Sequence, residues 1–147
     1  MLEERLGVWS ELLRSDDERR LTLLALDEGL VAFANSYFED DPRWGALLDN
    51  LHVAPSHARR GVGSALLAST AEAVLARGGG RGLYLWVLEQ NAGAQAFYRA
   101  LGASYAGRAP VTPPGGVAGR LSGSPAKLRY AWPEPRVLLA RARASGA

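Results

Sequence analysis

The stretch of residues 52–67, His-Val-Ala-Pro-Ser-His-Ala-Arg-Arg-Gly-Val-Gly-Ser-Ala-Leu-Leu, holds the residues whose types and spacing carry the clearest chemistry. It is typical of a strand that enters a glycine-bearing turn and then a helix. The first amides of a helix lack partners within it, and the helix dipole favours an anion there. Gly61 and Gly63 let a bulky anion approach the backbone, and Arg59 and Arg60 add positive charge. The stretch therefore predicts a pyrophosphate cradle.

Two other phosphate-binding motifs are excluded here. A Walker loop requires Gly-Lys followed by Ser or Thr, and the stretch contains no lysine. A dinucleotide-binding turn requires a third glycine after Gly-x-Gly, and that glycine is missing. Taken alone, Gly-x-Gly also fits a tight turn with no ligand.

The elements that must position this cradle follow from hydrophobic periodicity and turn residues. Residues 2–13 have helical spacing, and residues 21–26 and 30–38 read as antiparallel strands joined by a tight turn at 27–29. A polar loop at 39–45 precedes a strand at 46–53. The remaining elements are a helix at 62–77, a strand at 83–88, a helix at 91–101, strands at 103–108 and 127–132, and a short helix or frayed end after Pro135. This order predicts a mixed α/β (α+β) fold.

Composition bounds the function classes. The chain has 147 residues, 48% of them hydrophobic and 22% charged, which fits one globular domain. It has no cysteine and only two histidines, so neither a disulfide framework nor a metal site is expected. The net charge of +2 and the scattered arginines argue against nucleic-acid binding. Since no signal peptide and no membrane-length apolar run is seen, we expect no membrane association and a cytoplasmic location.

Two blocks in the right order and spacing resemble the GNAT superfamily of N-acetyltransferases. The first is Val53-x-Pro55 followed by Arg60-Gly61-Val62-Gly63-Ser-Ala-Leu-Leu67, which is similar to the superfamily's acyl-CoA pyrophosphate motif. The second is Leu85-x-Val87-x-x-x-Asn91-x-x-Ala94-x-x-Phe97-Tyr98-x-x-x-Gly102. The resemblance covers residues 21–102 and, more weakly, 127–132. It implies a mixed, mostly antiparallel central sheet with flanking helices on both faces.

The resemblance also implies a reaction. Acetyl-CoA is the expected cosubstrate, with no metal, and the acceptor is a small-molecule or peptide amine that attacks directly in a ternary complex. Tyr98 is expected to protonate the departing thiolate, and Asn91 to hydrogen-bond the cofactor. His52 and Val53 are expected to present backbone groups to the pantetheine arm where their strand splays from residues 85–88. The expected pyrophosphate ligands are Arg59, Arg60, Gly61, Val62, Gly63 and Ser64.

The general base is open. Asp49 is the first candidate to accept the amine proton, directly or through water, and Glu89 is the second. Asn91 fits a helix N-cap equally well, and Tyr98 also fits a core aromatic position. The acidic run at 39–41 is a solvated loop or, by resemblance, attracts a cationic acceptor. Trp44 is expected either to add an aromatic wall to the acceptor site or to anchor the loop. His57 is expected to be solvated in its loop.

The sequence departs from the superfamily pattern in two places. Ala58 occupies the position that is usually Gln or Arg, and the short N-terminus leaves room for one helix but no first strand. We therefore expect strand 21–26 at a sheet edge or covered by a second chain, which suggests a homodimer. The alternative functions are a non-catalytic acyl-CoA-binding regulatory domain and a nucleotide-binding or protein-interaction module. The predicted organisation is a single domain, 1–147, with an N-terminal helix (1–20), a CoA-binding core (21–108), a mobile loop (110–125) and a last strand with tail (126–147).

Overall fold

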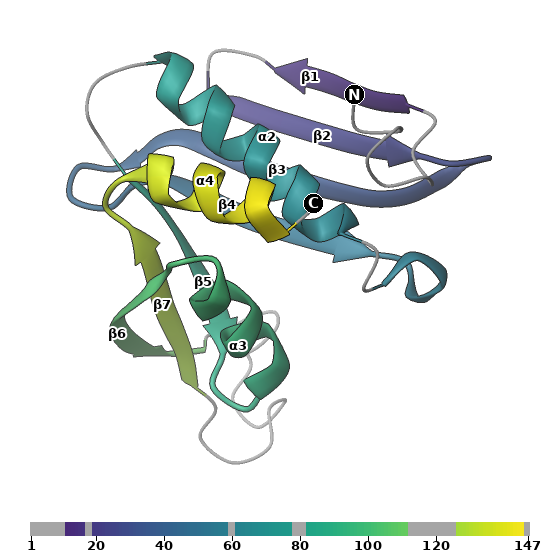
Figure 1. Ribbon diagram of the computed structural model, residues 1–147. Coiled ribbons are helices and arrows are strands. Elements are labelled where there is room, and N and C mark those ends of the chain that lie inside the picture. Colours follow the sequence, from purple (N-terminus) through teal and green to yellow (C-terminus); the bar gives the residue numbers. More distant parts are fainter. Residues whose placement is uncertain (1–10, 17–18, 59–60, 78–81, 112–125, 146–147) are drawn as a thin grey trace.

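A computed structural model describes residues 11–16, 19–58, 61–77, 82–111 and 126–145 (Figure 1). Its centre is a seven-stranded sheet of order β1-β2-β3-β4-β5-β7-β6. Only β4 and β5 pair in parallel, and the other neighbours are antiparallel. The predicted mixed, mostly antiparallel sheet is thus confirmed. The strands are β1 (Glu11–Asp16), β2 (Arg20–Leu26), β3 (Leu30–Asp41), β4 (Gly45–Val53), β5 (Leu83–Leu88), β6 (Ser104–Pro110) and β7 (Ala126–Trp132).

Alternating burial along the strands defines one core face of the sheet. In β2, Leu21, Leu23 and Ala25 are buried, and the residues between them are half-buried. Because successive side chains of a strand point to opposite faces, the buried set lies on one side of the sheet. Cross-strand partners continue this face, since Leu23 pairs with Ala34, which is also buried.

The helices of the described chain all pack on that core face (Figure 1). They are α2 (Val62–Arg77), α3 (Ala92–Ala100) and α4 (Pro135–Ser145), with a 3₁₀ turn, η1, at Pro55–His57. Helices on both faces were expected, so this expectation is corrected for the described residues. The C-terminal tail is a helix, α4, which packs along α2.

Helix α2 lies between the sheet and α4, and its composition reflects this position. Leu66, Leu67 and Ala71 are fully buried, and ten residues of the helix are buried in all. A helix that is covered on two sides must be apolar around most of its circumference. On the side of α2 that faces away from the sheet, α4 contributes the fully buried Leu138. This packing fixes the helix that begins at the expected cradle.

The N-terminal prediction is wrong in one respect. Residues 11–16 form β1, which pairs antiparallel with β2 from Glu11↔Leu26 to Asp16↔Leu21. The helix predicted for 1–20 and the absence of a first strand are therefore corrected, and β2 is not a sheet edge. Glu, Leu and Arg have modest strand propensity, so only pairing with β2 decides their conformation. Residues 1–10 lie outside the described residues.

The acidic run was also misassigned. Strand β3 continues through Glu39 and Asp40 to Asp41, and only residues 42–44 form a turn before β4. The predicted loop at 39–45 is therefore mostly strand and tight turn.

Pro110 ends β6, and residues 112–125 of the predicted 110–125 loop lie outside the described residues. In the part of the chain that the structure describes, no helix is long and apolar enough to span a membrane.

Candidate functional site

The parallel pair β4–β5 opens after only three residue pairs. Ala46, Leu47 and Leu48 pair with residues 83–85, and beyond Leu48 strand β4 pairs only with β3. Strand β4 leaves β5 at a β-bulge, where Asn35 of β3 pairs with Asn50 and the adjacent Ser36 pairs with Leu48. Asp49 is the extra residue. The gap between the two strands, called the splay below, is present as the resemblance implied.

Beyond the splay, the chain passes through η1 and reaches the N-terminus of α2. The first helical hydrogen bond runs from Ala65 N–H to Gly61 O at 3.0 Å, so the amides of Val62 and Gly63 precede the helical ladder. Gly61 has φ 79°, a conformation that suits glycine and few other residues. These backbone features favour an anion at this point. Arg59 and Arg60 lie outside the described residues.

A pocket of about 430 Å³ opens at this helix end, called the cradle pocket below. A Cβ added at Gly63 would lie 3.4 Å from the Phe97 ring and 3.8 Å from Val53 Cγ2, so a methyl group fits there, whereas a larger side chain would enter the pocket. Among the described residues, the cradle pocket therefore fits a ligand with an anionic group at one end and apolar surface along it. It is lined by Leu51, Val53, His57, Ala58, Gly61, Gly63, Ser64 and Phe97.

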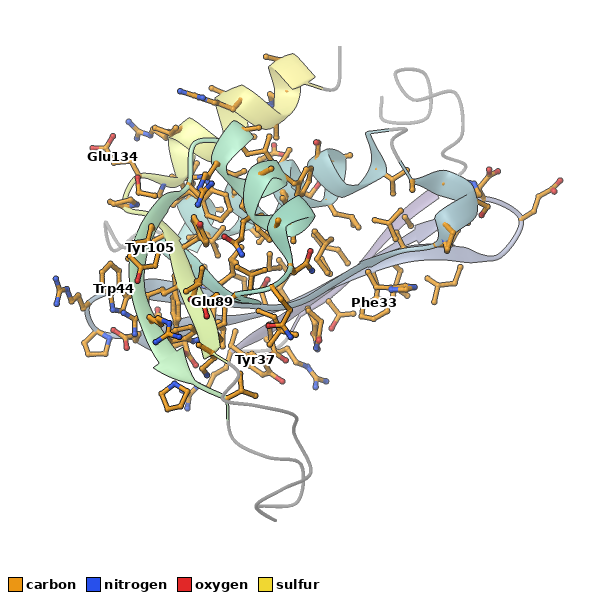
Figure 2. All side chains as sticks on the ribbon, turned by 90° about the horizontal axis from the view of Figure 1, so that it is seen from below. Phe33, Tyr37, Trp44, Glu89, Tyr105 and Glu134 are labelled. Carbon is orange, nitrogen blue, oxygen red and sulfur yellow. The ribbon has the colours of Figure 1, made fainter. Side chains whose placement is uncertain are left out.

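Two predicted cofactor ligands place their side chains away from this pocket. The exposed His52 ring lies 5.7 Å from the ring of Phe33. Figure 2 shows Phe33 and Tyr37 projecting from the face opposite the helices. The Val62 side chain is buried in the core, 1% exposed. Both residues can therefore serve a ligand in the cradle pocket only through their backbone groups, which is the role expected of them.

Helix α3 is fixed to the end of β5 by several polar contacts. Asn91 caps the helix, since its Oδ1 accepts a hydrogen bond from Ala94 N–H at 3.1 Å. The buried Gln95 donates from Nε2 to the carbonyls of Leu88 and Glu89, at 3.3 and 2.7 Å. The hydroxyl of Tyr130 donates to Gln95 Oε1 at 3.3 Å. The cap predicted at Asn91 is present, and its side-chain nitrogen has no partner among the described residues.

Tyr98 lies on the inner side of this fixed helix. Its ring is 6.2 Å from the Trp132 ring, edge to face, and 5.3 Å from the ring of its neighbour Phe97. The Trp132 indole N–H donates a hydrogen bond to Leu101 O at 3.0 Å. This bond fixes the Trp132 ring against the end of α3, where Tyr98 packs on it. Burial raises the pKa of the Tyr98 hydroxyl, so the phenol keeps its proton at neutral pH. Within the described residues this hydroxyl makes no hydrogen bond.

The two candidate bases have different surroundings. Asp49 is exposed at the bulge, and its Oδ2 accepts a hydrogen bond from Asn50 Nδ2 at 3.0 Å. Glu89 forms a bidentate pair with Arg108, at 3.0 and 3.1 Å. The hydrogen bond from Arg108 lowers the pKa of Glu89. A carboxylate held in its ionised form is a weaker base, so this geometry favours Asp49.

The acidic run of β3 is already engaged. Asp41 accepts hydrogen bonds from the backbone N–H groups of Arg43 (2.7 Å) and Trp44 (3.0 Å), and the bonds from Trp44 and then Arg43 lower the pKa of Asp41. Asp40 accepts a hydrogen bond from the Tyr84 hydroxyl, and Glu39 lies 3.7 Å from an Arg77 guanidinium nitrogen. The carboxylates thus act chiefly within the protein, which favours the structural role over cation steering.

Trp44 has a structural role as well. The guanidinium groups of Arg43 and Arg129 stack on its ring, at 4.6 and 4.7 Å from the ring centre. Arg129 also stacks on Trp86 at 4.5 Å. The tryptophan anchors the β3–β4 turn to β7, which was one of its two expected roles.

Sequence reasoning missed three contributors to the cradle pocket: Leu51, Phe97 and His57. The His57 side chain is only 13% exposed and contacts Asp27, so the prediction of a solvated histidine is wrong. The alternation of β4 places Leu51 on the same face as Val53, a signal that was available in the sequence. No local pattern pairs residue 57 with residue 27.

A second pocket, of about 410 Å³, is lined by Arg19, Arg20, Tyr37 and Asp40. Tyr37 projects from the face without described helices (Figure 2), whereas the cradle pocket is lined from the helical face. Tyr37 pairs with Leu47, beside the last β4–β5 pairs. The second pocket therefore opens on the face of the sheet opposite the cradle pocket. No group of three or more His, Asp or Glu side chains in the described chain could hold a metal ion.

Comparisons with known proteins agree with this architecture. The family model described as "Acetyltransferase (GNAT) family" matches residues 2–103. Nourseothricin acetyltransferase is 29% identical, with a TM-score of 0.67 over 82% of this chain and 68% of that chain. The ribosomal-protein-S18-alanine N-acetyltransferase from Escherichia coli is 26% identical, with a TM-score of 0.64 over 90% and 87%.

A third structure, NAA60 of Arabidopsis thaliana in complex with acetyl-CoA, shares the fold at 16% identity, with a TM-score of 0.64 over 79% of this chain and 77% of that chain. No curated protein sequence matches the chain.

Proposed function

The chain belongs to the acetyltransferase (GNAT) family, and we propose that it binds acetyl-CoA in the cradle pocket and transfers the acetyl group to an amine. The observation that carries this proposal is the cradle pocket itself. It joins an anion-binding helix end at Gly61 and Gly63 to an apolar wall that leads into the splay. A pyrophosphate with an extended arm fits both parts. The relatives named above include two acetyltransferases and one acetyl-CoA complex.

Thiol release provides the direct test of this function. The protein is mixed with acetyl-CoA and a panel of amines that includes aminoglycoside-like, polyamine, amino-acid and peptide acceptors, and free CoA is measured over time. We expect release that depends on at least one amine. The alternative function, a non-catalytic acyl-CoA-binding regulatory domain, predicts CoA binding by calorimetry without release for any amine. Competition by ATP would instead indicate a nucleotide-binding module.

The proposed reaction is direct attack by the amine nitrogen on the thioester carbonyl. A C–N bond forms and the C–S bond breaks, with no covalent enzyme intermediate, because the chain has no cysteine to act as a nucleophile. Backbone amides near Val53 stabilise the developing oxyanion. The proton of the amine passes to a base, and the departing thiolate takes a proton from Tyr98. The raised pKa keeps Tyr98 protonated at neutral pH but also makes it a weaker acid, so its effect depends on the position of the hydroxyl beside the thiolate.

The cofactor contacts follow the positions of the remaining residues. Backbone groups of His52 and Val53 lie on the β4 edge that has lost its β5 partner, where the pantetheine arm can pair with them. The pyrophosphate is held by the backbone from Gly61 to Ser64. Arg59 and Arg60 are proposed to add charge there. Asn91 is proposed to donate to the cofactor from its side-chain nitrogen while its oxygen caps α3.

The acceptor amine is proposed to approach from the other face of the sheet. The cradle pocket occupies the helical face of the splay, so the remaining access is from the face that carries Tyr37 and Asp40. Asp49 is exposed at the bulge where β4 leaves β5. We therefore propose Asp49 as the general base, acting directly or through a water molecule.

Replacing Asp49 with Asn tests this role. Removal of a general base costs on the order of 10²–10⁴ in rate, and we expect the lower end because water reaches this exposed site. The loss should shrink as pH approaches the pKa of the acceptor amine, where free amine no longer requires a base. Steady-state kcat/KM as a function of pH measures both effects.

Glu89→Gln is the matched control for Asp49. Both residues are exposed carboxylates, but Glu89 is already paired with Arg108. We expect this variant to keep nearly parental turnover. Loss of turnover in Glu89→Gln, with normal turnover in Asp49→Asn, would reverse the assignment.

A homodimer and a cytoplasmic location complete the proposal. Strands β1 and β6 form the outer edges of the sheet, and Tyr105 on β6 is 56% exposed. Exposed strand edges favour pairing between chains. Light scattering is expected to give twice the chain mass of 15.7 kDa. A mass equal to that of one chain would contradict the dimer.

A further inference from the structure

The side chain of His57 connects the cradle pocket to a turn 30 residues away in the sequence. Its Nε2 lies 3.0 Å from Asp27 Oδ2, and its Nδ1 lies 2.8 Å from Ser56 Oγ. The side chains of His57 and Asp27 are 13% and 33% exposed, so the contact is largely shielded from solvent. A shielded hydrogen bond to a carboxylate is stronger than an exposed one.

Both ring nitrogens of His57 are used, and a neutral imidazole satisfies both contacts. Nε2–H can donate to the carboxylate of Asp27 while Nδ1 accepts from the Ser56 hydroxyl. The contact therefore fixes the orientation of the ring as well as its position. A ring fixed at both nitrogens also fixes the backbone of η1, which carries it.

Two backbone hydrogen bonds hold the segments on either side of this contact, one within the β2–β3 turn and one to strand β3. Asp27 begins the β2–β3 turn, where its N–H donates to Gly29 O at 2.9 Å. On the other segment, Ala54 N–H donates to Val31 O at 2.8 Å. After Ala54 the chain leaves the sheet, and the hydrogen bond of the His57 side chain to Asp27 then attaches this segment to the β2–β3 turn.

The segment that His57 anchors forms one wall of the cradle pocket. His57 and Ala58 line the pocket together with Gly61 and Gly63. Ala58 has no polar side chain, so it cannot bind a phosphate oxygen through one. Among the described residues, the backbone N–H groups at the start of α2 are therefore important donors to an anion, and residues 57–58 stand beside them in the pocket wall. Preorganised donors bind an anion better than donors that must first be ordered.

We propose that His57 and Asp27 form a positioning clasp that holds residues 55–58 in place as one wall of the cradle pocket. The proposal rests on the proposed function, since the ligand is CoA. It assigns to Asp27, which lines no part of the cradle pocket, a specific effect on the affinity for the phosphate end of the cofactor. Neither residue reacts with the substrate.

The test compares two ligands across three variants. Asp27→Ala removes the acceptor, Asp27→Asn keeps an acceptor oxygen of similar shape, and Glu28→Gln removes a neighbouring carboxylate of the same turn. Calorimetry with CoA and with pantetheine, which lacks the pyrophosphate, gives the dissociation constants. Kinetics with acetyl-CoA separates KM from kcat, and thermal unfolding reports the stability of each variant.

We expect Asp27→Ala to weaken CoA binding about tenfold, equivalent to about 1.4 kcal/mol, and to leave pantetheine binding unchanged. KM for acetyl-CoA should rise with little change in kcat. Asp27→Asn should lose less, because its amide oxygen still accepts from Nε2–H. Glu28→Gln should bind both ligands like the parent.

Equal losses for CoA and pantetheine, or no loss for either, would overturn the clasp. A loss in Glu28→Gln as large as that in Asp27→Ala would also overturn it, by showing a general charge effect. If Asp27→Ala does not fold, Asp27→Asn decides, and parental CoA affinity with the neutral amide together with normal stability contradicts the need for the carboxylate. Failure of the parent protein to bind CoA would instead remove the proposed function.

Discussion

Tyr98→Phe is expected to lower kcat by about 10²–10⁴, with little change in the affinity for CoA. The phenol donates the proton that converts the departing thiolate into a thiol, and phenylalanine cannot replace it. A rate loss of this size corresponds to roughly 3–5 kcal/mol of activation barrier. Protonation of the thiolate by water would place the loss at or below the lower end of that range.

Tyr98→Phe removes the hydroxyl group and leaves the packing of the ring unchanged. The Tyr98 ring packs against Trp132 and Phe97, and phenylalanine keeps both contacts. Since the hydroxyl makes no hydrogen bond within the described residues, its removal leaves no polar group without a partner. Thermal stability should therefore stay close to that of the parent.

Steady-state kinetics and a CoA titration on the same variant decide whether Tyr98 is the general acid. Tyr130→Phe is not a suitable control, because the Tyr130 hydroxyl bonds to both Gln95 and Arg99. Tyr105→Phe is better, since Tyr105 is exposed on the outer strand β6. Parental turnover in Tyr98→Phe would falsify the general-acid role and favour the non-catalytic alternative.

Gly63→Asp is expected to weaken CoA binding by more than about 100-fold. The new carboxylate would stand in the first turn of α2, where we place the negative charge of the pyrophosphate. It would occupy the same positive end of the helix dipole and repel the phosphate oxygens. Loss of two hydrogen bonds to a charged group accounts for an effect of this size.

The Gly63→Asp variant should keep its thermal stability although it loses affinity for CoA. An acidic residue in the first helical turn is favourable for the helix, so the variant should not unfold at a markedly lower temperature. Gly63→Ala is the matched control, because its Cβ would lie 3.4 Å from the Phe97 ring and requires only a small shift. We expect near-parental CoA affinity for the alanine variant.

Gly61→Val is a less direct probe, although it also places bulk at the cradle. Gly61 has φ 79°, so valine would strain the turn itself and disturb the loop as well as the binding site. CoA binding by Gly63→Asp at the parental level, measured by calorimetry, would show that the pyrophosphate does not bind at this helix end.

The sequence by itself determined most local elements and the position of the cradle. Residues 83–88 are rich in Tyr, Trp, Val and Leu and form β5 as predicted. Asn91 caps the next helix with the hydrogen bond that its position predicted. Gly61 and Gly63 were identified because they stand in a strand-to-helix turn inside the first of the two blocks that resemble the GNAT superfamily. Each of these features depends on residues close together in the chain.

Only the tertiary structure decided which distant residues meet. Strand β1 exists because β2 offers it backbone partners, a fact that the helical spacing of its residues concealed. Glu89 is a poor base because of Arg108, and His57 is shielded because of Asp27, which lies in a different turn. Periodicity reports which side of an element is buried, but it does not report what covers that side. Those contacts depend on strand register and on the path of the loops, which are set by the packing of the whole chain.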